Sequence, residues 1–315
     1  MKCFGRVTRA RTLLRRILIA VVPTACAPAE AAPDPPIVAV GDADVPEVQS
    51  PPDAPQAPTH RTPIAGWEGR LMTWDMKSTI TGIASRTLTV LVPPGYDIDT
   101  TAHYPVLYMQ DGQNCLAHDG FGHGGWQMHT VLYDLIARGR MAKVIVAMVD
   151  SSKERNAEFI PEFSGGSKAD AYLNFLERDI IPFVDANFRT VADAPHRALG
   201  GSSFGALISL YGSWTRPTVY ARIMAMSPAY AYNFQALVKE RKTLRIYLDS
   251  GTTFDGASGD DSRTRTEFLR NVLVEKGWQL NVDLKHYVGI GHQHNEEFWR
   301  ARLPVALPFV FPASQ

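Results

Sequence analysis

Along most of the chain, hydrophobic residues recur either with the spacing typical of strands or with the spacing typical of helices. Segments of the two kinds follow one another and predict a succession of strands and helices. Short apolar or alternating runs of strand length occur at 86–92, 104–109, 143–149, 196–200, 222–226, 244–248 and 282–288. Apolar residues with helical spacing occur at 126–137, 167–184, 206–211, 264–275 and 296–309. Strands that alternate with helices in this way predict a doubly wound, mostly parallel sheet with helices on both faces.

Particular residues predict where some of these helices begin and end. Ser167, with Asp170 three residues on, resembles a capping box and predicts a helix N-terminus. Pro182 lacks a backbone N–H, so we expect it to kink or end that helix. Asn295 precedes Glu296 and Glu297, a pattern that predicts the N-cap and first turn of the last helix.

The first 65 residues lack this pattern and predict segments outside the folded domain. Six basic residues precede an apolar run, 17–22, and a stretch of small residues that ends at Ala27. This order is typical of a secretory signal peptide over 1–27, and the run is too short to span a membrane. Residues 28–65 are rich in Pro, Ala and Asp and predict a disordered linker.

The leader predicts export, and its processing leaves alternatives open. Cleavage could follow Ala27 or Ala31, or Cys26 could become the lipid-modified first residue of a lipoprotein. The expected destinations are therefore the periplasm, a lipid anchor with Cys26 as membrane tether, or the medium. Cys115 has no obvious partner cysteine, so no structural disulfide is expected.

The net charge changes once the leader is removed. The whole chain has 32 basic and 32 acidic residues, but without the six basic residues of the leader 26 basic residues remain against 32 acidic. The mature protein then has a charge near −6, which argues against nucleic acid as a partner.

The stretch from Gly201 to Gly205 matches G-x-S-x-G and has Ser203 at its centre. This motif is a sharp strand-to-helix turn that exposes the serine hydroxyl at the helix N-terminus. The apolar runs on either side predict the strand and the helix that the turn requires. Ser203 is therefore the candidate nucleophile.

A serine nucleophile needs a general base and an acid that orients the base. His292 and His294 lie between the last strand and the last helix, and His294 is favoured because it adjoins the Asn295 cap. A metal site that includes His286 is disfavoured because no acidic ligand pattern accompanies it. No metal or cofactor is expected.

The acid should follow the strand at 244–248, where four carboxylates are candidates: Asp249, Asp255, Asp260 and Asp261. Asp249 ends the strand and could serve only to brace the turn. Asp260 and Asp261 adjoin the next helix, where either could stabilise its N-terminus. Asp255 lies in a loop and has no comparable structural task, so it is the favoured acid.

An oxyanion needs two backbone N–H donors. Phe204 follows the nucleophile and should supply one of them. Gln113, in the turn Asp111-Gly112-Gln113 after the strand at 104–109, should supply the other.

These motifs, in this order, resemble the putative-esterase family of the α/β-hydrolases. The matching stretches are 107–114, 200–205, 247–252 and 294–296 with Trp299. The family includes feruloyl and acetyl-xylan esterases, ferric-siderophore esterases, S-formylglutathione hydrolase and mycolyltransferases. Many relatives have the acid where this chain has Phe254, one residue before Asp255. The resemblance implies an α/β-hydrolase catalytic domain over 66–315 and supports Gln113 and Phe204 as oxyanion donors.

The resemblance implies a serine carboxylesterase that acts through an acyl-enzyme, and the leader predicts that this enzyme is exported. Its expected substrate is an ester of a small molecule or one linked to a polysaccharide. Two alternatives remain open: an acyltransferase of the mycolyltransferase type that passes the acyl group to a sugar, and a binding module without catalysis. The Ser, His and acid set argues against the binding module.

Overall fold

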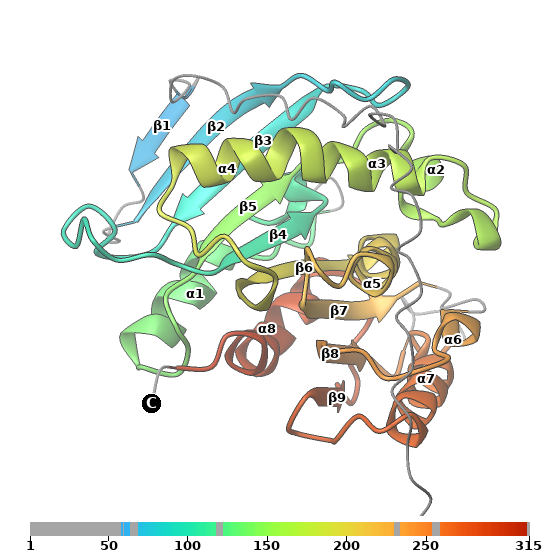
Figure 1. Ribbon diagram of the computed structural model, residues 1–315. Helices are drawn as coiled ribbons and strands as arrows, with labels where there is room; N and C mark the ends of the chain where they lie inside the picture. The colour runs from blue at the N-terminus through green and yellow to red at the C-terminus, as the bar shows by residue number, and fades with distance from the viewer. Residues whose placement is uncertain are drawn as a thin grey trace, which may run out of the picture. The chain divides into compact units, whose positions relative to one another are not determined.

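The computed structural model describes residues 58, 60–63, 69–117, 122–229, 234–253 and 259–313. They form one nine-stranded sheet with strand order β1-β2-β3-β5-β4-β6-β7-β8-β9 (Figure 1). The strands are β1 (His60–Pro63), β2 (Arg70–Met76), β3 (Arg86–Val92), β4 (Val106–Gln110), β5 (Ile145–Val149), β6 (Arg197–Ser203), β7 (Arg222–Pro228), β8 (Arg245–Ser250) and β9 (Leu284–Val288).

Strand direction divides the sheet into two parts. β1, β2 and β3 pair antiparallel, as does β3 with β5. From β5 to β9 every pairing is parallel. The prediction of a mostly parallel sheet is confirmed, although β1 and β2 were not foreseen and β1 lies within the range expected to be linker. The carboxyl ends of the parallel strands meet at one edge, where ligands bind in open α/β sheets.

The helices of the described residues connect these strands. They are α1 (Met128–Ala137), α2 (Arg155–Phe159), α3 (Ala169–Phe175), α4 (Ile181–Asn187), α5 (Phe204–Thr215), α6 (Phe234–Leu237), α7 (Arg263–Glu275) and α8 (Glu296–Val310). A π-helical segment, η3 (Leu176–Ile180), joins α3 to α4, and short 3₁₀ turns include η1 (Gly112–Asn114).

Two details of the helix predictions differ from the structure. Ser167 is not an N-cap: Lys168 holds that position in α3 and its side chain makes no capping hydrogen bond. Pro182 lies in the first turn of α4, directly after η3, and the helical path continues to Asn187. A π turn before Pro182 is a local way to accommodate the ring and its missing N–H without ending the helix.

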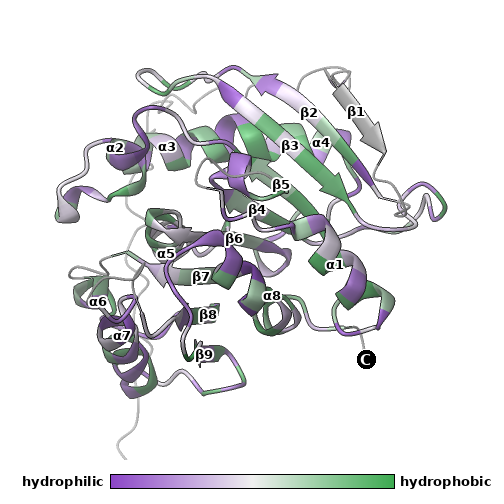
Figure 2. Ribbon diagram, turned by 180° about the vertical axis from the view of Figure 1, so that it is seen from behind, coloured by the Kyte–Doolittle hydropathy of each residue, from purple (hydrophilic) through white to green (hydrophobic). Residues whose placement is uncertain are grey.

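Helices cover both faces of the sheet and divide its core into layers. α3 and α4 pack over β2 to β5, and α5 and α7 pack over β7 and β8 on the same face. α1 and α8 pack together on the opposite face. Figures 1 and 2, seen from opposite sides, show these two helical layers, and Figure 2 shows the hydrophobic central strands between them.

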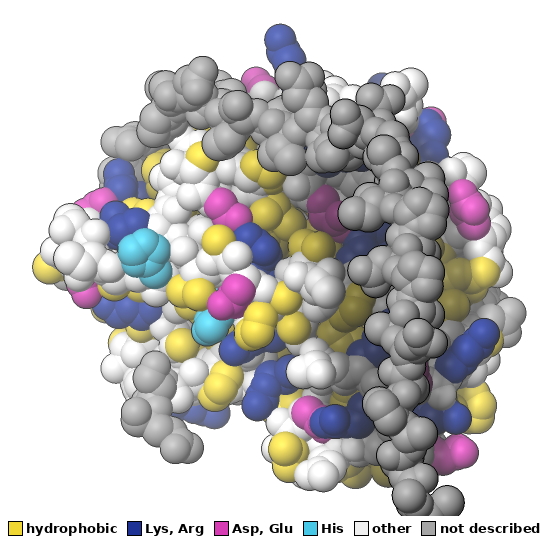
Figure 3. Space-filling model, viewed as in Figure 1, with side chains coloured by type: hydrophobic (Ala, Val, Ile, Leu, Met, Phe, Trp, Pro, Cys, Tyr) yellow, Lys and Arg dark blue, Asp and Glu magenta, His cyan; other side chains and the backbone are white. Residues whose placement is uncertain are grey.

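The segments expected to be a signal peptide, 1–27, and most of the linker, 28–65, lie outside the described residues. Within the described part of the chain, no helix is both long and apolar enough to cross a membrane. Cys115 is a buried free thiol, and burial raises its pKa well above the usual value. Figure 3 shows basic and acidic side chains interspersed on one face, without a large field of one sign.

Candidate active site

Ser203 lies at the sharp turn that the G-x-S-x-G motif predicts. It is the last residue of β6 and the N-cap of α5, and its backbone has φ 56° and ψ −125°. A positive φ is costly for a residue with a Cβ, and such strain persists only where the surroundings impose it. The turn places the Ser203 hydroxyl at the N-terminus of α5, where the helix dipole favours negative charge.

Gly201 and Gly205 allow this turn because the backbone on either side of Ser203 passes very close to other atoms. A Cβ on Gly201 would lie 2.8 Å from the carbonyl carbon of Gly205. A Cβ on Gly205 would lie 3.0 Å from a carboxylate oxygen of Asp111. The motif therefore requires glycines for close packing between strand, helix and the loop after β4.

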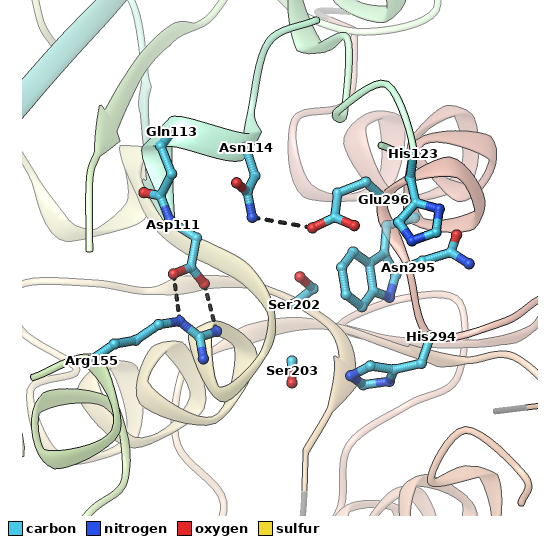
Figure 4. A pocket seen from close by; sticks show the side chains of 11 residues that line it. Asp111, Gln113, Asn114, His123, Arg155, Ser202, Ser203, His294, Asn295 and Glu296 are labelled. Atoms are coloured by element: carbon cyan, nitrogen blue, oxygen red, sulfur yellow. Dashed lines mark hydrogen bonds and ion pairs between the residues drawn. The ribbon is translucent and has the colours of Figure 1, made fainter. Parts of the chain in front are cut away.

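His294 lies on the loop between β9 and α8, directly before the N-cap of α8. Asn295 accepts a hydrogen bond from the N–H of Phe298, so the cap predicted from sequence is confirmed. The Trp299 ring packs edge-on against the imidazole, with 5.0 Å between ring centroids. The cap and the tryptophan fix the orientation of the imidazole, which points toward Ser203 (Figure 4).

The carboxylate that binds His294 in the structure is Asp261. Its Oδ1 lies 2.5 Å from Nδ1 of His294, and the aspartate is fully buried. Its Oδ2 accepts hydrogen bonds from the Ser227 hydroxyl at 2.6 Å and from the Gly251 N–H at 2.5 Å. Three short contacts therefore hold this carboxylate at the far nitrogen of the imidazole.

Asp255, the acid favoured by the sequence, lies outside the described residues. Among the described residues, Asp261 occupies the position at Nδ1 that the acid of such a set requires. Sequence reasoning treated Asp260 and Asp261 alike, as acids that stabilise the next helix. Only Asp260 does so, since its Oδ2 accepts hydrogen bonds from the Thr264 N–H at 2.9 Å and from the Thr264 hydroxyl at 2.5 Å.

His292 has contacts that suit a structural role in the loop. Its carbonyl accepts hydrogen bonds from the N–H groups of Thr252 and Thr253, at 3.1 and 3.2 Å. Its ring packs against Phe298, and burial lowers the pKa of the imidazole. A Cβ on Gly251 would lie 2.1 Å from the His292 carbonyl oxygen, so glycine is required there. These contacts join the loop of His294 to the turn after β8.

Asp249 is buried and bound by other groups, as expected for a residue that braces the strand end. Its Oδ2 lies 3.0 Å from Nε of Arg302 and 2.9 Å from the Tyr247 hydroxyl. Its Oδ1 accepts the Ser227 N–H at 3.0 Å. Asp249 therefore belongs to a buried network behind Asp261.

The turn after β4 places Gln113 at the same cavity as Ser203. Asp111 adopts a left-handed conformation, φ 56°, and starts η1. Gly112 is required next, because a Cβ there would lie 2.7 Å from the Met148 backbone. The Gln113 side chain is held by two hydrogen bonds with Ser151, at 2.8 and 3.0 Å. Its backbone is thereby fixed beside the cavity.

The second predicted oxyanion donor, Phe204, is the first residue of α5. Its N–H lies at the positive end of the helix dipole and directly follows Ser203. The two predicted donors thus come from the ends of adjacent parallel strands, β4 and β6.

Ser203 and His294 line one cavity of about 480 Å³ (Figure 4). Its remaining walls come from the turn after β4, the loop before α1, α2, the end of β6 and the start of α8: Asp111, Gln113, Asn114, His123, Arg155, Ser202, Asn295, Glu296 and Trp299. Arg155 neutralises Asp111 through two hydrogen bonds of 2.6 and 2.8 Å. The Asn114 amide donates to the buried Glu296 carboxylate at 3.1 Å. The cavity therefore has both polar and apolar walls, and the Glu296 carboxylate is one of the groups that line it.

Among the described residues, no group of three or more His, Cys, Asp or Glu side chains could hold a metal ion. The three histidines of the disfavoured metal site contact different residues. His286 lies 3.5 Å from the Thr266 hydroxyl, His292 packs on Phe298 and His294 binds Asp261.

The chain matches a known protein family over most of its length. The family described as "Putative esterase" matches residues 83–310, which include every strand from β4 to β9 and all the residues of the cavity. The chain belongs to this family. It is accordingly a carboxylic ester hydrolase with an α/β-hydrolase fold.

The chain is also similar to individual proteins of other organisms. The uncharacterised Bacillus subtilis protein YjcH is 28% identical over 232 residues, which cover 70% of this chain and 89% of YjcH. A siderophore triacetylfusarinine C esterase of Aspergillus fumigatus is 36% identical over 78 residues, covering 25% of this chain and 26% of that enzyme.

Solved structures share the fold. A ferulic acid esterase superposes with a TM-score of 0.61 at 17% identity, covering 79% of this chain and all of that one. The enterobactin esterase of Shigella flexneri superposes with a TM-score of 0.59 at 18% identity, covering 81% of this chain and 60% of that one.

Sequence reasoning missed several residues of the esterase site. Ser227, Arg302 and the Arg155–Asp111 pair did not stand out, because each lies far along the chain from the groups it contacts. A local indication existed only for Arg302. It follows Trp299 by three residues, and this spacing places the two side chains on the same face of the helix that follows His294.

Proposed function

We propose that the esterase hydrolyses carboxylic esters through a Ser203–His294–Asp261 triad and a covalent acyl-enzyme. The observation that carries this proposal is the alignment of three groups: a strained serine at the cavity, an imidazole directed at it, and a buried carboxylate on the far nitrogen of that imidazole. This arrangement is what a weak hydroxyl nucleophile requires.

In the first half of the reaction, Ser203 Oγ attacks the ester carbonyl carbon while His294 Nε2 accepts the hydroxyl proton. Asp261 keeps the other ring nitrogen, Nδ1, protonated and stabilises the positive charge that forms on the imidazole. The tetrahedral intermediate then collapses. The bond between the carbonyl carbon and the alcohol oxygen breaks, and the alcohol leaves with the proton from His294, so that the acyl group remains on Ser203.

Water reverses these roles in the second half. His294 accepts a proton from water as the oxygen attacks the acyl carbon, and it returns that proton to Ser203 Oγ as the carboxylic acid leaves. The N–H groups of Gln113 and Phe204 are the proposed donors to the oxyanion in both halves. Preorganised donors of this kind each contribute on the order of 10²–10³-fold in rate.

The cavity supports a small ester as substrate. A volume of about 480 Å³ accommodates an acyl group and an alcohol of modest size. The Glu296 carboxylate disfavours an anionic group beside the reacting ester, and its oxygens suit substrate hydroxyl donors. Ferulic acid esterases and enterobactin esterases share the fold, so hydroxylated aromatic esters are a reasonable substrate class to test first.

Hydrolysis of a short p-nitrophenyl ester tests the proposed function. Ser203→Ala should lower kcat by about 10³-fold or more, because losing one triad member removes nucleophilic catalysis. Ser202→Ala is the matched control, since it removes a neighbouring hydroxyl from the same strand and should leave most of the activity. Normal turnover by a folded Ser203→Ala protein would reject the proposal.

The same assay with an added sugar separates hydrolysis from the acyltransferase alternative. An esterase should release free acid at a rate that the sugar does not change. Acyl transfer to the sugar in preference to water would favour the alternative and leave the role of Ser203 intact.

A further inference from the structure

Behind Asp261 lies a fully buried polar network that joins three elements. Ser227 comes from the end of β7, Asp249 from β8 and Arg302 from α8, and none of the three is exposed to solvent. Buried charges are costly unless they are paired and hydrogen-bonded. The way in which these groups satisfy one another therefore indicates what the network does.

The Ser227 hydroxyl is at the centre of the network. A hydroxyl has one donor and two acceptor sites. Ser227 Oγ donates to Asp261 Oδ2 at 2.6 Å and accepts from Nη2 of Arg302 at 2.6 Å and from Nε1 of Trp299 at 3.1 Å. Since Arg302 and Trp299 occupy both acceptor sites, the hydroxyl proton is directed to Asp261. Ser227 itself has φ 42°, a strained backbone that keeps the hydroxyl in this position.

Arg302 supplies the positive charge of the network. Its Nε lies 3.0 Å from Asp249 and its Nη2 lies 3.7 Å from Asp261 Oδ2, so one guanidinium faces two buried carboxylates. Burial raises the pKa of Asp249, while the adjacent Arg302 acts in the opposite direction. With Arg302 in place the cluster has one excess negative charge, which matches the single positive charge that forms on His294 during catalysis.

Trp299 connects the network to His294 directly. It donates to Ser227 and packs edge-on against the imidazole, while Asp261 binds the same imidazole at Nδ1. The helix α8, which begins just after His294, therefore contributes two side chains, Trp299 and Arg302, and both donate to the serine that binds Asp261.

We propose that Arg302 and Ser227 are positioning residues that hold Asp261 against His294 as a charged acceptor. The inference rests on the proposed triad. Neither residue lines the cavity or contacts the reacting atoms. Each acts through Asp261, whose loop before α7 is anchored by Ser227, Arg302 and the Gly251 N–H.

The positioning role predicts a change in pH dependence. The titratable groups around Asp261 and His294 are Asp249 and Tyr247 from β8, His292 from the same loop, Glu296 at the start of α8, and Arg302. A carboxylate that loses a donor or a nearby cation attracts a proton on His294 more strongly. The neutral imidazole that acts as base would then be present only at higher pH.

Kinetics across pH, with Ser227→Ala and Arg302→Lys, test the proposal. Ser227→Ala should lower kcat by about 10- to 100-fold with little change in KM, as is typical for groups that orient a reacting side chain. Its acid limb should move to higher pH. Arg302→Lys keeps the charge, but its single ammonium lacks the fixed spacing with which Nε and Nη2 of Arg302 reach Asp249 and Ser227, so kcat should fall while the acid limb stays near its original position. Arg302→Met removes the charge and should move the limb as Ser227→Ala does.

Arg86→Met is the control for loss of a buried arginine, because Arg86 forms a bidentate pair with Glu158 away from the cavity. It should lower thermal stability without moving the acid limb. If Ser227→Ala and Arg302→Lys lose stability as Arg86→Met does and keep the wild-type kcat and acid limb, the positioning role is wrong. If Arg302→Met does not fold, the kcat and acid limb of Ser227→Ala and Arg302→Lys are sufficient to test the positioning role. Failure of the triad itself is separate, since Ser203→Ala would then remain active.

Discussion

At the scale of single residues, backbone conformation separates neighbours of identical chemistry. Asp260 and Asp261 are both aspartates before α7, but Asp261 has φ 47° and the next residue, Ser262, has φ 61°. These two left-handed residues turn the Asp261 side chain into the protein interior, while Asp260 remains at the helix end. One carboxylate therefore binds Thr264 in the first turn of α7 and the other binds His294.

Because the two aspartates have different contacts, substitution of Asp261 should lower activity, whereas substitution of Asp260 should lower stability. Asp261→Asn should lower kcat on a p-nitrophenyl ester by about 10³- to 10⁴-fold, because the amide no longer holds His294 in the productive tautomer. Asp260→Ala should leave kcat nearly unchanged and cost about 1 kcal/mol of stability through loss of its hydrogen bonds to Thr264. Asp255→Asn should be close to wild type in both respects. A severe loss of kcat in Asp255→Asn, with an active Asp261→Asn, would restore the acid that the sequence favoured.

The sequence predicts the nucleophile and base of the proposed triad, whereas it favours an acid other than the one proposed from the structure. Ser203 lies within a local motif, and His294 adjoins a cap whose signature is also local. The partner of His294 depends on how a loop folds back over β7 and β8, and on Ser227, Gly251 and Arg302, which are distant along the chain. The pattern of residues in a short stretch of sequence carries no information about such contacts.

At the scale of elements, most strands and helices follow from hydrophobic spacing because each buries a continuous face. β3 and the helices α7 and α8 begin or end within a residue of the predicted bounds at one end or both. The helical spacing over 167–184 agrees with α3, η3 and α4, but the π-helical form of η3 and the continuation beyond Pro182 to Asn187 were not foreseen. Packing of Leu173, Phe175, Ile180 and Val184 into one core layer favours continuation.

The contact between α7 and β9 predicts a pH-dependent part of the stability. Burial, with Arg270 and Arg263 nearby, lowers the pKa of His286 to about 4. An unfolded histidine binds a proton near pH 6.5, so the unfolded state takes up more protons as pH falls from about 6.5 to about 4. The folded protein should therefore lose about 2 kcal/mol between pH 7 and pH 5 through this group.

Thermal unfolding of His286→Gln at pH 7 and pH 5 measures that contribution. The variant should lose less stability on acidification than the wild type, and the exposed His103→Gln control should behave as the wild type does. Comparison between variants is needed because Asp150 acts in the opposite direction. Burial raises its pKa to about 6, which favours the folded state as pH falls below that value. An equal loss in wild type and His286→Gln would contradict the prediction.

At the scale of the whole molecule, the site is assembled from strand ends that are far apart in the chain. The Gln113 turn follows β4, and β6 ends at Ser203. Ser227 lies one residue before the end of β7 and Asp249 one residue before the end of β8, and all four strands are parallel neighbours. The fold class was predictable, because alternating strands and helices impose parallel strands. The antiparallel β1 and β2 were not, since β1 lies within a proline-rich stretch that favours a linker.

The N-terminal segment predicts that the mature protein is exported and shorter than the full chain. Mass spectrometry of the protein expressed with its own leader should find an N-terminus between Cys26 and Ala32. A diacylglyceryl group on Cys26 would indicate a membrane tether, and a free terminus at Pro28 or Ala32 would indicate secretion. Retention of Met1 in the mature protein would contradict the prediction of a cleaved leader.

The most direct measurement of the catalytic account is peptide mass spectrometry after inactivation with diethyl p-nitrophenyl phosphate, which phosphorylates activated serines. The account predicts one diethylphosphoryl group per chain on Ser203, loss of esterase activity in proportion to labelling, unchanged labelling in Ser202→Ala and no labelling in Ser203→Ala. A label on another residue that accounts for the lost activity, or full labelling and activity in Ser203→Ala, would contradict it.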